Sequence, residues 1–178
     1  MAIMAAEEPI TLKEVQLRLG MPQHILIHLC EKGVIAPDFA ETSGRGKRRE
    51  FSRRNLFEFA VALALRKFEL PVSMTAFVIR LLRSFERAML KPVPGFALPG
   101  FLLEHGIELI LHFYDGHFLV FHASGSGLRR PLLLGVDISE ASKDSGARPR
   151  IEKLDELPTR FDAQLEINLT RIAKRVFE

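Results

Sequence analysis

The sequence predicts an α+β fold, in which a helical winged helix-turn-helix domain precedes a small antiparallel β domain with a terminal helix. Apolar residues recur at helical spacing through about residue 90, and prolines and glycines then interrupt this pattern. Short β-type segments follow the interruption. We therefore expect a first domain over residues 1–91, a Pro/Gly linker over 92–100 and a second domain over 101–178.

The first two predicted helices form a helix-turn-helix. Thr11 and Glu14 make a T-x-x-E capping box, which predicts a helix start directly after Thr11. Gly20 is expected to end this helix in a left-handed conformation. Pro22 suits the first turn of the next helix, because its missing N–H has no helical partner there. Gly33 is expected to close the second helix.

A basic loop flanked by glycine follows the second helix. The cations of this loop and of the next helix start are Arg45, Lys47, Arg48, Arg49, Arg53 and Arg54. Residues 1–91 contain 15 basic and 10 acidic side chains, a net charge of +5, whereas 92–178 contain 10 and 12, a net of −2. A helix-turn-helix beside a basic loop is typical of proteins that bind double-stranded DNA.

Two segments resemble the DNA-binding domain of the mercury-resistance-regulator (MerR) family. The segment Glu31–Pro37 reads E-K-G-V-I-A-P and is similar to the family's E-x-G-L-I-x-P. The segment Arg49–Leu56 reads R-E-F-S-R-R-N-L and is similar to its R-x-Y-S-x-x-D-L. The chain departs from the family at Ile27, where arginine is usual, and at Asn55, where aspartate is usual. The resemblance covers about the first half of the chain and implies a winged, DNA-binding transcription regulator.

Two further helices are predicted to complete the first domain. Ser52 is expected to cap a helix that runs to about Glu69. Pro71 interrupts this helix, and apolar residues at helical spacing then predict another helix to about Leu90. The prolines and glycines of 92–100 cannot continue it.

A β-hairpin is predicted at the start of the second domain. Asp115-Gly116 lies between two apolar segments, and this dipeptide is typical of two-residue hairpin turns. The expected elements of this domain are strands over Ile107–Phe113, His117–Ala123 and Pro131–Ile138, an extended segment over Ala163–Asn168, and a terminal helix capped by Thr170.

The two-residue turn would pair Tyr114 with His117 and Leu111 with Val120, which makes both faces of the hairpin largely apolar. A hairpin with one solvent-exposed face should alternate apolar and polar residues. The family's long dimerising helix is not evident after the first domain. We therefore predict a homodimer with Ile110, Leu119 and Phe121 at or near the contact. In the alternative, the terminal helix covers that face within one subunit.

Catalytic and metal chemistry are not predicted. In the expected register His112 and His117 share a face and His122 lies opposite, which gives no face with two histidines and a carboxylate. The segment Ser124–Arg130 lacks the Gly-Lys-Ser/Thr ending of a phosphate loop. A single cysteine, Cys30, excludes an internal disulfide and a cysteine-based zinc site. We predict a chain that is not an enzyme and needs no cofactor or metal.

The sequence therefore predicts a sequence-specific DNA-binding transcriptional regulator that acts as a dimer. Gln23, His24 and His28 face outward on the second helix and are expected to contact bases, while Arg45, Lys47, Arg48 and Arg49 are expected to contact phosphates. Arg53 and Arg54 are further predicted DNA-binding residues. An unknown small-molecule or protein effector is possible at the second domain. No apolar run is long enough for a membrane span, and the chain is expected in the bacterial cytoplasm, at the nucleoid. The alternative is a non-enzymatic adaptor that binds a protein or bends DNA.

Overall fold

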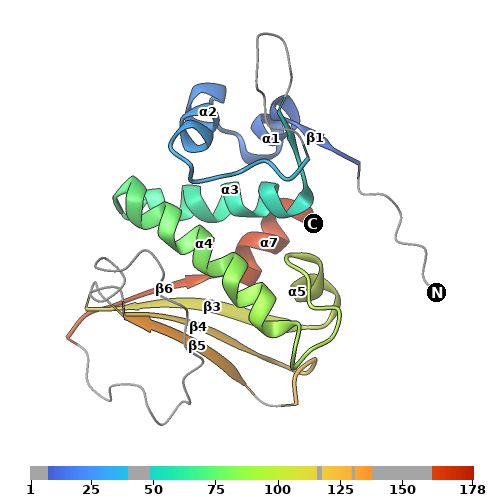
Figure 1. The fold of residues 1–178 in the computed structure, drawn as a ribbon, viewed down its shortest axis with the longest axis vertical. Coiled ribbons are helices and arrows are strands. Elements are labelled where there is room, and N and C mark those ends of the chain that lie inside the picture. The colour runs from blue at the N-terminus through green and yellow to red at the C-terminus, as the bar shows by residue number, and fades with distance from the viewer. Residues whose placement is uncertain (1–7, 40–48, 116–117, 130, 138–161) are drawn as a thin grey trace. The chain divides into compact units, whose positions relative to one another are not determined.

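The computed structural model describes residues 8–39, 49–115, 118–129, 131–137 and 162–178 (Figure 1). The chain divides into two compact units, called unit 1 and unit 2 below. Unit 1 comprises Met1–Arg80 together with Arg175–Glu178, and unit 2 comprises Leu81–Lys174. The predicted α+β class is confirmed: the N-terminal part is helical, and a four-stranded antiparallel sheet and a terminal helix follow.

Unit 1 is built from short helices around a small antiparallel strand pair. Its elements are β1 (Ile10–Thr11), α1 (Leu12–Leu19), α2 (Gln23–Glu31), β2 (Glu50–Phe51), α3 (Arg53–Arg66) and the first part of α4 (Val72–Met89). β1 pairs with β2 through Ile10–Phe51 and Thr11–Glu50. The rings of Phe51 and Phe59 meet edge to face, with centroids 5.2 Å apart, and both are fully buried. The core therefore joins the returning strand β2 to α3.

The helix starts predicted after Thr11 and Ser52 are confirmed, whereas Pro22 precedes the first turn of α2 and does not lie within it. Thr11 and Glu14 form the reciprocal capping box of α1, and Gly20 ends that helix with a left-handed φ of 61°. Ser52 caps α3 by accepting from the backbone N–H of Asn55. α2 begins directly after Pro22, and Gly33, just past its end, has a φ of 66°. Local capping chemistry is enough to define these ends.

Unit 2 contains a four-stranded antiparallel sheet in the order β5-β4-β3-β6. Its elements are the end of α4, α5 (Gly100–Glu104), β3 (Ile107–Tyr114), β4 (Phe118–Gly125), β5 (Leu132–Asp137), β6 (Gln164–Asn168) and most of α7 (Leu169–Phe177). Phe85 of α4 stacks on Phe121 of β4, with centroids 5.3 Å apart. The sheet face that carries Phe121 is therefore covered within the unit.

The segment 92–100, predicted as a linker, belongs to unit 2 by contacts. Phe96 is buried and packs against Phe85 and Phe101. The backbone N–H of Leu98 donates to the buried carboxylate of Glu86 at 2.8 Å. The two compact units divide between Arg80 and Leu81, within α4.

The predicted hairpin register is wrong by one residue. Tyr114 pairs with Phe118 and Leu111 with Phe121, so three residues, not two, separate the strands. Asp115 has a φ of 51°, and its carboxylate accepts from the backbone N–H groups of residues 162 and 163 at the entry of β6. A shift of one residue moves every side chain of β4 to the other face. His112 and His122 therefore share a face, with ring centroids 6.2 Å apart.

The predicted cap of the terminal helix is also wrong. Thr170 lies inside α7, where its buried hydroxyl donates to the carbonyl of Ile107 and accepts from the N–H of Leu109. Asn168 takes the capping position, because its side-chain oxygen accepts from the N–H of Arg171 at 2.9 Å. Thr170 instead ties α7 to the first residues of β3.

Candidate nucleic-acid interface

The second helix presents the residues predicted to read bases. Gln23 and His24 are exposed and His28 is half-buried. Leu26 and Leu29 are fully buried on the opposite side. α2 therefore has one side fixed in the core and one polar side toward solvent, which is the arrangement that a recognition helix requires.

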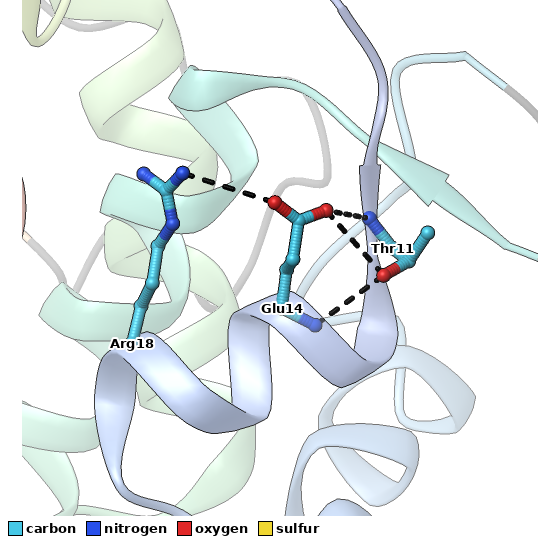
Figure 2. Close-up of polar contacts among 3 residues, drawn as sticks. All are labelled: Thr11, Glu14 and Arg18. Atoms are coloured by element: carbon cyan, nitrogen blue, oxygen red, sulfur yellow. Dashed lines mark hydrogen bonds and ion pairs between the residues drawn. The ribbon is translucent and has the colours of Figure 1, made fainter.

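The start of α1 is fixed to the strand that returns from the basic loop. Figure 2 shows the Glu14 carboxylate accepting from the backbone N–H of Thr11 at 3.2 Å, while its other oxygen lies 3.8 Å from the guanidinium of Arg18. The Thr11 hydroxyl accepts from the N–H of Glu14 at 3.3 Å. Because Thr11 pairs with Glu50 in the β1–β2 ladder, these contacts hold α1 against the base of the loop.

The cations predicted to bind DNA divide into two groups. Arg45, Lys47 and Arg48 lie outside the described residues. Arg49 is half-buried just before β2, and Arg53 and Arg54 begin α3, Arg53 exposed and Arg54 half-buried. No acidic residue lies in the first turn of α3. The described cations, Arg49, Arg53 and Arg54, therefore lie where the chain passes from β2 into α3.

Arg49 lies close enough to α2 to influence its cysteine. Burial raises the pKa of the Cys30 thiol to about 11, and the positive charge of Arg49 opposes this shift. Glu31, the last residue of α2, raises the pKa further. The positive charge of Arg49 therefore acts on a residue of α2. The raised pKa also identifies Cys30 as a protonated, unreactive thiol at neutral pH.

Asn55 forms a polar centre that joins both ends of the basic loop. Its side-chain oxygen accepts from the backbone N–H groups of Asp38, at 2.8 Å, and Ser52, at 3.2 Å. Its amide nitrogen donates to the carbonyl of Ala36 and to the Glu58 carboxylate, both at 3.0 Å. Asn55 is fully buried, and all four bonds are made inside the protein.

A hydrogen bond between Ser52 and Asp38 also joins the two ends of the basic loop. The Ser52 hydroxyl donates to the Asp38 carboxylate at 2.6 Å while it accepts from the N–H of Asn55. Asp38 precedes the loop and Ser52 follows it, so this short bond spans the loop ends. The sequence marked Asn55 only as a departure from the family pattern. A polar residue at a buried helical position was the available signal for this role.

The residues predicted at a dimer contact do not share one face of the sheet. Leu119 and Phe121 are each 1% exposed within the single chain, on the face that Phe85 covers. Ile110 is half-buried on the opposite face, where it pairs with His122. The one-residue shift of register separates them. Ile110 is thus the member of the set that a second subunit could reach without unfolding the sheet.

The histidines of unit 2 form no metal centre among the described residues, where no three His, Cys, Asp or Glu side chains are placed to hold an ion. His112 is held by Gln164, at 3.1 Å from Nδ1, and by Glu166, at 3.8 Å. Burial lowers the pKa of His112, and Glu166 opposes the change.

No protein-family model and no curated protein matches this chain. In the part of the chain that the structure describes, no helix is both long and apolar enough to cross a membrane.

Proposed function

We propose that this chain is a sequence-specific double-stranded DNA-binding transcriptional regulator that acts as a homodimer. The observation that carries the proposal is that one compact unit contains both a solvent-facing polar helix, α2, and a cationic loop base whose strand β2 pairs with the start of α1. This is the geometry in which a helix enters the major groove while cations lie over the backbone. The segments that resemble the MerR family support the same function, and such a regulator would act at the nucleoid in a bacterial cytoplasm.

We propose a dimer because the DNA-contacting surface of a single copy would be small. A single small helix-turn-helix reads few base pairs, so specificity usually requires two copies on a palindrome-like site. Ile110, half-buried on the face of the sheet opposite Phe121, is the predicted contact residue that a second subunit could reach. An effector bound at unit 2 would act on the unit that we propose to form the dimer.

The proposal is tested by selecting bound fragments from the source genome at moderate salt. Recovery of one recurrent, palindrome-like sequence supports a regulator. An absence of binding even at low salt, where phosphate contacts are strongest, contradicts it.

A second candidate is an adaptor that binds a protein or bends DNA architecturally. Three exposed large apolar side chains among the described residues of unit 1 favour a protein partner: Leu17 is 70% exposed, Phe68 50% and Phe39 47%. DNA binding without sequence preference would support the architectural form. Binding to no DNA would support the protein adaptor.

The basic loop is expected to supply affinity without specificity. Replacing Arg48 and Arg49 with alanine should weaken binding to all duplexes and reduce the slope of log K against log salt by about one per lost phosphate contact. Binding is measured over a series of salt concentrations. Arg66→Ala, at the far end of the same helix α3, is the matched control and should leave the slope unchanged. An unchanged slope in the double variant would remove the loop from the interface.

Gln23 is expected to read one base pair. A glutamine side chain can form two hydrogen bonds with an adenine edge in the major groove. Gln23→Ala should therefore lower discrimination at a single position of the selected site by about 1–3 kcal/mol. Competition between the selected site and its single-base variants measures this loss. An equal loss on selected and random DNA would instead make Gln23 a backbone contact.

A further inference from the structure

An aromatic residue from the far end of the chain lies under the first arginine of α3. The guanidinium carbon of Arg53 is 5.0 Å from the centroid of the Phe177 ring. Arg53 is exposed, and Phe177 is half-buried at the end of α7. Both residues belong to unit 1, because Arg175–Glu178 cluster with the N-terminal residues. The distance is that of a cation–π contact.

The position of Arg53 does not favour the stability of α3. The first turn of a helix carries the positive end of the helix dipole, so a cation is disfavoured there. Arg53 nevertheless occupies this turn, in which no acidic residue lies. An anion bound here would be favoured both by the charge of Arg53 and by the positive end of the helix dipole.

Stacking orders the guanidinium without using its hydrogen-bond donors. The attraction is between the positive charge and the face of the ring, so N–H groups of the guanidinium stay available to the oxygens of a phosphate. A free arginine side chain loses rotamer entropy when it binds, and a side chain already held in place loses less. Phe177 can therefore strengthen a phosphate contact that it does not itself make.

We propose that Phe177 is a positioning residue that holds Arg53 ready to bind the phosphate backbone of double-stranded DNA. This role rests on the proposed DNA-binding function and adds a contribution from α7 to it. Sequence pattern alone gives no sign of it, because 124 positions separate the two residues.

The test compares Phe177→Leu, which keeps apolar volume without a π face, with Phe177→Trp, which keeps the π face. A mixed-sequence DNA duplex is the probe, since a phosphate contact is independent of sequence. Phe177→Leu is expected to weaken binding about two- to five-fold at low salt, the equivalent of an exposed cation–π contact. Phe177→Trp should bind like the wild type. Val176→Ala, the neighbouring half-buried residue, is the control and should also bind normally.

The same measurements in an Arg53→Ala background separate positioning from folding. Arg53→Ala alone should reduce the salt slope by about 0.9. Phe177→Leu should then have no further effect, because the side chain that it positions is absent. A loss of affinity that persists in this background is a folding effect and overturns the proposal. So does a Phe177→Leu variant that binds as tightly as the wild type.

Failure of the proposed function gives a different result. A wild-type chain that does not bind the duplex at low salt removes DNA binding itself, and the role of Phe177 with it. A wild-type chain that binds while all Phe177 variants bind equally overturns the positioning role alone.

Discussion

Replacing Asn55 with alanine is expected to lower the free energy of unfolding of unit 1 by about 3–5 kcal/mol. The change removes the four hydrogen bonds that Asn55 makes with the N–H groups of Asp38 and Ser52, the carbonyl of Ala36 and the carboxylate of Glu58. Of these partner residues, Ser52 and Glu58 are buried. Each unsatisfied buried group costs about 1–3 kcal/mol, and relaxation of the loop ends recovers part of this. Chemical denaturation followed by circular dichroism measures the loss.

Ser52→Ala is the matched control for this prediction. It removes the cap of α3 and the bond to Asp38 but leaves the Asn55 side chain in place, so it should cost about 1 kcal/mol. A similar small cost for Asn55→Ala would mean that water or a rearranged loop replaces the lost bonds. DNA affinity should fall in Asn55→Ala even under conditions where the variant is folded, because only the Ser52–Asp38 bond then joins the ends of the basic loop.

Leu119→Glu is expected to unfold unit 2. Leu119 is 1% exposed and pairs with Phe113 and Val136 on the covered face of the sheet. A carboxylate there has no described partner and is removed from water, which costs on the order of 5 kcal/mol or more. Loss of the β signal in circular dichroism is the expected readout. A folded variant would mean that the covering helix moves away readily.

Ile110→Glu is the informative companion variant for assembly. Ile110 is half-buried on the opposite face, so its replacement carboxylate can reach water and the sheet should stay folded. If this face joins two subunits, light scattering should show a folded monomer, and operator binding should weaken strongly. A wild-type chain that is monomeric at high concentration, with and without DNA, contradicts the proposed homodimer.

The sequence predicted most accurately those features that depend on residues close together in the chain. The capping box at Thr11, the left-handed Gly20 and the Ser52 cap are contacts within four residues, and each is present. The hairpin register failed because the carboxylate of Asp115 binds the backbone at residues 162 and 163, far along the chain. A prediction made from the two turn residues alone cannot include this long-range contact.

The same distinction holds for the candidate site. The outward polar residues of α2 follow from helical period alone, and the structure exposes Gln23 and His24. The polar centre at Asn55 joins Ala36 and Asp38 across the basic loop, and Phe177 reaches Arg53 from the last helix. Such contacts depend on which distant segments fold together, and periodicity carries no information about that.

The division of unit 1 between two distant segments has a consequence for how the protein is made. Arg53 leaves the ribosome before Leu81–Lys174, whereas Phe177 follows that segment. At roughly 5–20 residues per second, its synthesis takes roughly 5–20 s. During this interval the helix-turn-helix can fold while Arg53 still lacks its aromatic partner. Each newly made molecule would therefore pass through a state in which α2 is folded while the Arg53 side chain is not yet held by the Phe177 ring.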